Sequence, residues 1–251
     1  MKISKPSHLV TVVIPIYKAT FTEAEKRSFQ QCIRVLAGYP VKIVKPESLD
    51  LNELHASYPD IELMSFEDKY FKGVDSYNEL MTSLFFYERF TAFEYMLIYQ
   101  LDAFVFRDEL TAWCKKGFDY IGSPTLHQES FDSFSADAKE CYGAALSSRR
   151  VVLNGGLSLR RVRSFIKYLK IYNTFYPAWK GNEDMLFSQE ATRLLPMKLF
   201  MKLPTWQEAL HFAFEKSPAA SFALTDRKLP FGCHAWERYD PAFWKDYIDL
   251  K

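Results

Sequence analysis

The chain has 251 residues, and its 32 lysines and arginines against 31 acidic residues leave a formal charge of +1. This balance argues against a nucleic-acid-binding protein, whose phosphate contacts usually need a strong basic excess. With 48% hydrophobic and 25% charged residues, the chain is not disordered. Its 17% of aromatic residues indicates either a core packed with rings or a site that stacks flat ligands such as bases and sugars.

The cysteines and the N-terminus bear on the cellular compartment. Cys32, Cys114, Cys141 and Cys233 form no CxxC pair, so we expect buried free thiols in a reducing compartment. The apolar run near the N-terminus is interrupted by proline and histidine, and no cleavage site or stretch of about 18 apolar residues follows. We therefore expect a cytoplasmic protein without a transmembrane segment, and leave open peripheral attachment at the inner membrane face.

The first half of the chain alternates between strand and helix patterns. Residues 9–17 are a β-branched run typical of a buried strand. Residues 22–37 read as a helix, with a capping box at Thr22 and Glu25 and a stop at Gly38. The other elements expected here are strands at 41–45 and 61–66, a helix at 76–90 and a strand at 95–101.

Residues 95–101 are apolar almost throughout, which predicts a central parallel strand covered on both faces. Strands that alternate with helices predict an α/β fold with a mainly parallel sheet flanked by helices. Residues 123–150 lack periodicity, and a loop of this length is usually functional or mobile. Further on, short strands flank residues 154–156, and helices are expected at 161–172 and 183–193.

Asp102 follows the apolar strand, where open α/β sheets bind ligands beyond the carboxyl ends of their strands. A carboxylate in that position must be paired, protonated or metal-bound, because burying it bare is costly. A helix N-cap or a salt bridge to arginine is the structural alternative. Gln100, two residues earlier, would point to the same side.

Two further polar segments are candidates for a site. Asn154, Gly155 and Gly156 read as a hairpin turn, although consecutive glycines also let a backbone approach a ligand closely. Asn182 is a good N-cap, and Glu183 and Asp184 suit the first turn of the helix. A carboxylate there could also act as a general base beside a sugar stacked on the nearby Trp179.

The remaining candidates are a histidine and a group of arginines. His234 stands in the sequence FGCHAW, and a single histidine near an aromatic residue is usually structural. The other histidines show no metal-binding spacing. The arginines near the glycine pair form either a solvated helix face or a surface for a diphosphate or an acidic partner; they are Arg149, Arg150, Arg160, Arg161 and Arg163.

The order of these candidates along the chain resembles the GT-A nucleotide-sugar glycosyltransferases. More specifically, the chain looks like a largely bacterial family of uncharacterised glycosyltransferase-like proteins. The matching stretches run from about residue 10 to 245 and are VVIPIYK, SYNELM, FEYMLIYQLDAFVF, DYIGSP, NGGLSLR, NEDMLF and LPFGCHAW. The resemblance implies a GT-A-like, Rossmann-related single domain over residues 1–251. Its nucleotide-binding part would cover about 9–122 and its acceptor-binding and catalytic part about 123–251.

The resemblance also implies roles for individual residues. Asp102 would bind a divalent metal, Mn²⁺ or Mg²⁺, at the position of the superfamily's Asp-x-Asp motif, although only one acid is present here. His234 would be a second metal ligand. Glu183 and Asp184 would lie near the acceptor, with Asp184 as the base. The donor would contact Pro15, Tyr17, Tyr77, Asn78, Gln100, Asn154, Gly155 and Gly156.

The resemblance implies a glycosyltransferase that moves a sugar from a nucleotide donor, expected to be UDP-linked, onto a glycan or lipid-linked acceptor, and analogy with the family alone implies surface-polysaccharide synthesis. A single base at Asp184 predicts inversion at the anomeric carbon. Acceptor specificity is expected in the loop 123–150 and around Trp179, and Trp236 is expected beside the site as a stacking ring. The alternatives are a carbohydrate-binding protein that has lost catalysis, and another nucleotide-using transferase. The second would need a glycine-rich phosphate loop, yet residues 15–30 contain no glycine.

Overall fold

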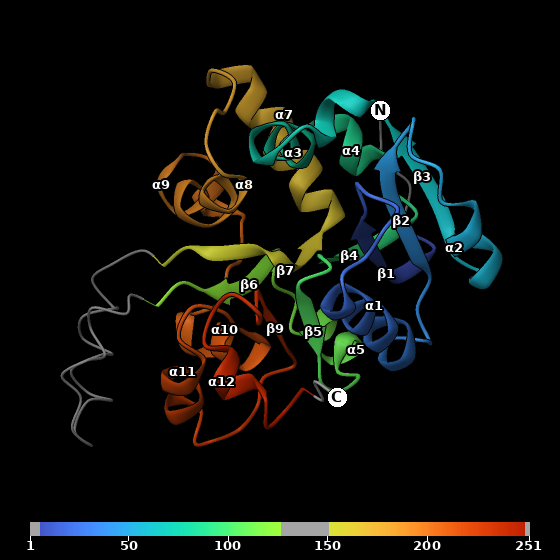
Figure 1. Cartoon of the computed structure of the whole chain (residues 1–251). Helices are drawn as coiled ribbons and strands as arrows, with labels where there is room; N and C mark the ends of the chain where they lie inside the picture. The colour runs from blue at the N-terminus through green and yellow to red at the C-terminus, as the bar shows by residue number, and fades with distance from the viewer. Residues whose placement is uncertain (1–5, 127–150, 249–251) are drawn as a thin grey trace.

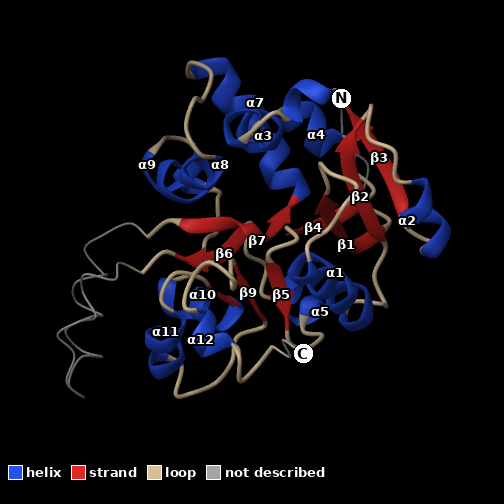
Figure 2. Cartoon of the chain, in the orientation of Figure 1, coloured by secondary structure: helices blue, strands red, loops and turns tan. Residues whose placement is uncertain are grey.

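A computed structural model describes residues 6–126 and 151–248. Within them the strands form two sheets, one of six strands in the order β3-β2-β1-β4-β7-β6 and one of three in the order β5-β9-β8 (Figures 1 and 2). The strands are β1 (His8–Pro15), β2 (Val41–Pro46), β3 (Glu62–Phe66), β4 (Phe93–Tyr99), β5 (Ala103–Val105), β6 (Tyr120–Pro124), β7 (Leu153–Arg161), β8 (Ala213–Phe214) and β9 (Gly232–His234).

Helices cover both faces of the large sheet, with α3, α4 and α7 on one side and α1 and α5 on the other (Figure 1). The segments around the small sheet include α10, α11 and α12. The helices are α1 (Glu23–Val35), α2 (Asn52–Ser57), η1 (Asp68–Phe71), α3 (Val74–Met81), α4 (Leu84–Glu88), α5 (Leu110–Lys115), α7 (Val162–Phe175), α8 (Glu183–Met185), η3 (Leu186–Glu190), α9 (Ala191–Arg193), η4 (Met197–Leu199), α10 (Trp206–Phe212), α11 (Pro218–Leu224) and α12 (Pro241–Trp244).

The large sheet is parallel on one side and antiparallel on the other. β1 pairs in parallel with β2 and β4, and β2 pairs in parallel with β3. β7 runs antiparallel to both β4 and β6. The strands predicted at 9–17 and 95–101 are confirmed as β1 and β4, which are buried in the middle of the sheet. The strand at 95–101 was expected to be parallel, and β4 is parallel to β1 but antiparallel to β7. The carboxyl ends of β1 and β4 therefore lie at the same edge as the start of β7.

Aromatic rings make up much of the core of the large sheet. The ring centroids of Phe165 and Phe187 lie 4.3 Å apart, and those of Tyr87 and Phe165 lie 4.9 Å apart. Tyr120 and Tyr168 extend the same buried cluster. Most of the aromatic composition is therefore explained by packing of the core.

Several local predictions agree with the structure. The capping box of Thr22 and Glu25 is present at the start of α1. The helix ends at Val35, however, before Gly38 and without a left-handed glycine. Cys32, Cys114 and Cys233 are buried free thiols, whereas Cys141 lies outside the described residues. Within those residues, no helix is both long enough and apolar enough to span a bilayer.

The prediction of one helix over 76–90 is wrong, because the segment forms the two short helices α3 and α4. Ser83 is extended between them. The hydroxyl of Thr82 donates to the carbonyl of Asn78 at 2.7 Å, and that of Ser83 donates to the carbonyl of Leu80 at 2.6 Å. These side chains close the end of the first helix, since serine and threonine compete with helical hydrogen bonds.

The hairpin turn predicted at residues 154–156 is also wrong. Asn154, Gly155 and Gly156 lie inside the single strand β7. The second expectation, that the glycines let the backbone approach a ligand, stays a prediction, and the close neighbours that the structure shows are side chains of this chain. A Cβ added at Gly155 would meet the Glu183 carboxylate, and one added at Gly156 would meet the His234 imidazole.

Candidate functional site

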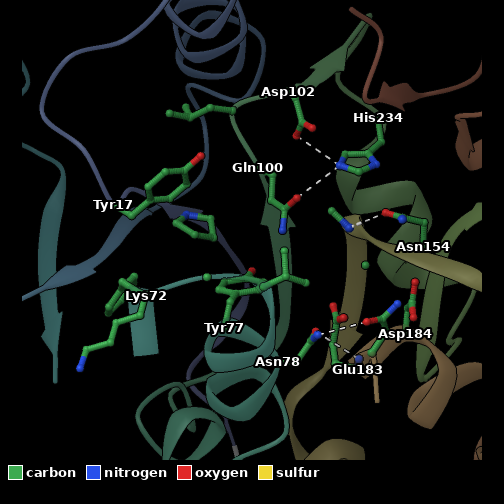
Figure 3. Close-up of a pocket in the computed structure, with 18 of the residues that line it drawn as sticks. Tyr17, Lys72, Tyr77, Asn78, Gln100, Asp102, Asn154, Glu183, Asp184 and His234 are labelled. Atoms are coloured by element: carbon green, nitrogen blue, oxygen red, sulfur yellow. Dashed lines mark hydrogen bonds and ion pairs between the residues drawn. The ribbon is translucent and has the colours of Figure 1, made fainter. Parts of the chain in front are cut away.

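One cavity of about 680 Å³ lies at the edge of the large sheet where β1 and β4 end. Its walls come from segments far apart in the sequence, including the start of α3, the strand β7, the start of α8 and the end of β9. The residues that the resemblance assigned to metal, base and donor all line it, whereas the expected stacking rings Trp179 and Trp236 do not (Figure 3). Those that line it are Pro15, Tyr17, Tyr77, Asn78, Gln100, Asp102, Asn154, Gly155, Gly156, Glu183, Asp184 and His234.

His234 stands at the centre of the polar side of this cavity. Its Nε2 atom lies 3.2 Å from Asp102 Oδ1 and 3.3 Å from Gln100 Oε1, as the dashed lines of Figure 3 show. Its Nδ1 atom lies 3.3 Å from Oε1 of Glu215, a buried residue that follows β8. Burial opposes a charge on the imidazole, but the hydrogen bonds to Asp102 and Glu215 raise the pKa of His234 to about 10.

The backbone holds this group in place. Gln100 and Asp102 lie in the tight connection between β4 and β5, where the Ala103 N–H donates to the carbonyl of Gln100 at 2.9 Å. The Gln100 N–H donates to the carbonyl of Gly156, also at 2.9 Å. β5 in turn pairs with β9, which sets Ala103 opposite His234. The small sheet therefore brings a histidine from late in the chain to the end of β4.

The donor atoms of this group suit a hard divalent cation. Within residues 6–126 and 151–248, no three His, Cys, Asp or Glu side chains are arranged around one metal position. Gln100, however, adds an amide oxygen to the Asp102 carboxylate and the His234 imidazole. Two ligand atoms at ~2.1 Å from one octahedral ion are separated by about 3 Å, which the 3.2 Å between Asp102 Oδ1 and His234 Nε2 matches.

Glu183 and Asp184 face the same cavity but differ in their surroundings. Glu183 is buried, and its Oε1 atom lies 2.8 Å from Nη2 of the fully buried Arg160. Oδ1 of Asp184 is buried without a hydrogen-bond partner among the described residues. Burial and then repulsion from Glu183 raise the pKa of Asp184 to about 7. Asp184 is thus able to exchange a proton near neutral pH.

The start of α8 is fixed by a contact with α3. The Glu183 N–H donates to Asn78 Oδ1 at 3.3 Å, and Asn78 Nδ2 donates to Asn182 Oδ1 at 3.2 Å. Asn182 precedes the helix as expected, but its own side chain does not cap the helix. On β7, the Gly156 N–H donates to Asn154 Oδ1 at 2.8 Å. These amides therefore order the wall beside Asp184.

The opposite wall is more open and partly cationic. Tyr17 follows β1 and is 62% exposed, so its ring is available at the rim of the cavity. Lys18 pairs with Glu25 at 2.8 Å, and Lys72 also lines this side. Tyr77 lies deeper, with its hydroxyl buried. Lys18 ends the matching stretch VVIPIYK but was assigned no role, and Lys72 lies in none of the matching stretches, so neither lysine was predicted.

Two other expectations, for Trp236 and Arg160, were wrong, whereas the partly exposed Arg161 agrees with a solvated face. Trp236 is buried in the core beside the small sheet, where its Nε1–H donates to Ser28 Oγ at 3.2 Å, so it is not a ring of the site. Arg160 is neither on a solvated face nor free for a diphosphate, because it is the buried partner of Glu183. Arg161 pairs with Glu94 at 2.6 Å.

Acceptor specificity was expected in the loop 123–150, and Arg149 and Arg150 were among the arginines considered for a diphosphate or an acidic partner. Residues 127–150 lie outside the described residues, so these predictions are not tested. Trp179 is near the site but does not line the cavity. Its Nε1–H donates to the carbonyl of Asn182 at 3.0 Å. Its part in acceptor binding stays a prediction.

A family model described as a protein of unknown function, DUF5672, matches residues 60–234. Among curated proteins, no sequence gives a significant match. A structure of the galactosyltransferase LgtC with donor and acceptor sugar analogs has a TM-score of 0.52 and 11% identity, over 89% of this chain and 86% of that one.

An active-site mutant of LgtC gives a TM-score of 0.53 at 10% identity, with the same coverage. The structure of a glycosyltransferase involved in glycosylation of the major capsid of PBCV-1 has a TM-score of 0.47 and 8% identity, over 97% of this chain and 100% of that one. The similarity to LgtC shows that this chain has the GT-A fold expected from the sequence. At these identities it is evidence for the fold alone.

Proposed function

Because the chain belongs to the DUF5672 family and has the fold of GT-A glycosyltransferases, we propose that it transfers a sugar from a nucleotide-sugar donor to an acceptor hydroxyl. We further propose a UDP-linked donor and a glycan or lipid-linked acceptor. The observation that carries the proposal is the meeting of Asp102, His234 and Asp184 at one cavity beyond the carboxyl ends of β1 and β4. Ligands of open α/β sheets bind at this edge.

The nucleotide is proposed to bind on the side of Pro15 and Tyr17. The exposed Tyr17 ring offers a surface on which a base can stack. Tyr77 and Asn78 line the adjoining part of the cavity, and Lys18 and Lys72 supply positive charge there. This arrangement supports a phosphate-bearing ligand whose diphosphate points toward Asp102.

Gln100, Asp102 and His234 are the residues that would hold Mn²⁺ or Mg²⁺. When bound, such an ion neutralises the charge that develops on the leaving diphosphate. Burial opposes ionisation of Asp102, but the hydrogen bond from His234 keeps the pKa of Asp102 below its ordinary value. Asp102 is therefore a carboxylate at neutral pH, as metal binding requires.

Asp184 is the proposed general base. It would accept the proton of the acceptor hydroxyl while that oxygen attacks the anomeric carbon and the bond to the diphosphate breaks. Glu183 is held by Arg160, so it would shape the wall and set the charge beside Asp184 rather than take the proton. One base in this position predicts inversion at the anomeric carbon. A product with retained configuration, detected by NMR, would contradict it.

The test is donor binding by the whole protein in a thermal-shift screen of nucleotide sugars with Mn²⁺. A ligand that binds only the native state raises the melting temperature, so a UDP-sugar should raise it with Mn²⁺ and much less with a chelator. Asp102→Asn should abolish the Mn²⁺-dependent part of the shift and leave the melting temperature without ligand nearly unchanged. An equal shift in the variant would show that Asp102 does not bind the metal.

The replacement of an acid by Gln100 favours one second candidate, a sugar-nucleotide-binding protein that has lost catalysis. The two functions differ in turnover. Release of UDP from a donor that binds, with or without acceptor, would support the enzyme. Measurable binding of several nucleotide sugars without turnover of any would support the binding protein.

A further inference from the structure

Glu215 is a buried carboxylate that no motif in the sequence marks. It follows β8, which pairs in parallel with β9 so that Phe214 lies opposite Cys233. This register places Glu215 beside His234, the last residue of β9. Glu215 is only 4% exposed, and its Oε1 atom lies 3.3 Å from Nδ1 of His234. Its Oε2 atom is buried without a hydrogen-bond partner in the described chain.

The His234 imidazole is enclosed on three sides. Its Nε2 edge faces Gln100 and Asp102 (Figure 3), and its Nδ1 edge faces Glu215. A Cβ added at Gly156 would meet Nε2, Cδ2 and Cε1, so the ring packs directly against the strand β7 at that glycine. The ring therefore has little room to turn, and its two nitrogens face different groups.

The contact with Glu215 determines which nitrogen is free. A histidine ligand binds a metal through a ring nitrogen that carries no proton, while the other nitrogen usually donates to a carboxylate or carbonyl. A cation bound here would replace the Nε2 proton that the imidazolium shares with Asp102, while the Nδ1 proton stays donated to Glu215, so that the Nε2 lone pair is directed toward Gln100 and Asp102. Among the described residues, Glu215 is the hydrogen-bonding partner of Nδ1.

A buried carboxylate is costly unless it is compensated. Glu215 has no arginine or lysine ion pair among the described residues, and its one polar contact is with His234. If the side chain served only to pack against the imidazole, an apolar residue could do so at a lower free-energy cost of burial. The one counter-charge of Glu215 in the described chain is the His234 imidazolium, and this exclusive pairing with a residue of the cavity is a reason to assign Glu215 a role at the site.

We propose that Glu215 is a positioning residue that fixes the tautomer and orientation of His234 for binding a divalent cation. The inference rests on the proposed function, because it assumes that His234 is a metal ligand. It adds a residue of the small sheet, behind the imidazole, to those that face the cavity.

The experiment is Mn²⁺ binding to the whole protein, measured by calorimetry with UDP present. Glu215→Leu removes the acceptor from Nδ1 and should weaken Mn²⁺ affinity by about 10- to 100-fold, the usual effect of losing such a partner. Glu215→Gln keeps an oxygen of the same reach and should retain most of the affinity. Rescue by the conservative variant is expected only if the hydrogen bond matters.

Glu237→Gln is the matched control. Glu237 lies three residues beyond His234, and its pKa is raised by burial and by the charge of Glu25 and Asp102, so it belongs to the same electrostatic neighbourhood. It makes no hydrogen bond with the imidazole in the described structure. This variant removes a nearby negative charge and should bind Mn²⁺ within about threefold of the wild type, a margin well inside the loss expected for Glu215→Leu.

The outcomes separate the two proposals. Wild-type protein that binds no Mn²⁺ with UDP present would overturn the metal site itself. Wild-type affinity in a folded Glu215→Leu variant would overturn the role of Glu215 and leave the metal site intact. A loss in Glu215→Gln as large as that in Glu215→Leu would assign the effect to charge rather than to positioning, and would also overturn the inference.

Discussion

Asp184 has an environment unlike that of an ordinary surface aspartate. Burial and the charge of Glu183 raise its pKa to about 7, and one of its oxygens has no partner in the described chain. A base must be deprotonated to act, so the rate of sugar transfer should rise with pH through about 7. Asp184→Asn should lower kcat by about 10²- to 10⁴-fold and leave donor binding intact. Pre-steady-state and steady-state rates between pH 5 and 9 measure this.

The raised pKa of Asp184 also predicts how the stability of the Asp184→Asn variant depends on pH, and this serves as a control for damage to the fold. A raised pKa means that the folded protein holds the proton more tightly than the unfolded chain. This contribution is full below the ordinary pKa and is lost as the pH rises through about 7. Asp184→Asn should therefore melt a few degrees above the wild type at pH 8 and close to it at pH 4. A variant that is less stable at pH 8 would show that its lost activity reflects damage to the fold.

Residue types at the site could be predicted from the sequence, but their partners could not. Asp102 and Asp184 stand next to recognisable strand and helix patterns, so their positions follow from local reasoning. Glu183 and Arg160 are 23 residues apart and lie on different elements, and nothing local indicates that they pair. Glu215 was not predicted as a site residue for the same reason. Only the register of β8 with β9 brings it next to His234.

At the scale of elements, the glycines of β7 are the most informative segment. The sequence favours a turn at residues 154–156, because turn propensity depends on neighbouring residues alone. The side chains that crowd the strand come from segments distant in sequence and leave no local signal. In the structure the absence of side chains makes room for Glu183 and His234. The split of the helix over 76–90 has a similar cause, because its apolar pattern continues across the residues that end α3.

Gly155→Ala tests this account of β7. The new Cβ would meet the Glu183 carboxylate and lie 2.8 Å from Nη2 of Arg160, so the pair must shift. We expect a loss of about 1–3 kcal/mol in the free energy of unfolding, as overpacking of a core usually costs. Urea denaturation measures it. Gly38→Ala is the control, because nothing lies within 4 Å of its added Cβ, and it should be neutral or slightly stabilising.

At the scale of the whole molecule, Arg160 joins parts of the chain that lie far apart. Its Nη1 atom donates to the Tyr87 hydroxyl of α4 at 2.9 Å, and its Nη2 atom meets Glu183 of α8. Arg160→Met leaves Glu183 buried without its counter-charge, which should cost about 3–5 kcal/mol of stability in urea denaturation. Arg161→Met, which removes a partly exposed ion pair with Glu94, should cost no more than about 1 kcal/mol. Equal costs would contradict the special role of Arg160.

The large sheet could be predicted from the sequence better than the small sheet that completes the site. Apolar runs mark β1 and β4 because central strands need cover on both faces. The small sheet could not be expected, because β8 and β9 are too short to show a pattern and β9 pairs with β5 across more than a hundred residues. The site lies where these two sheets meet, and for that reason its complete geometry is absent from any one stretch of sequence.

The place of His234 on β9 has a consequence for how the protein acquires its site during synthesis. A nascent chain that has not yet reached β9 already contains all strands of the large sheet, together with Asp102 and Asp184. β5 still lacks its pairing partner at that stage, and the connection that carries Gln100 and Asp102 is not yet anchored. Contacts between segments so distant in sequence are slow to form. Competence to bind a ligand should therefore come late in folding, after the large sheet is in place.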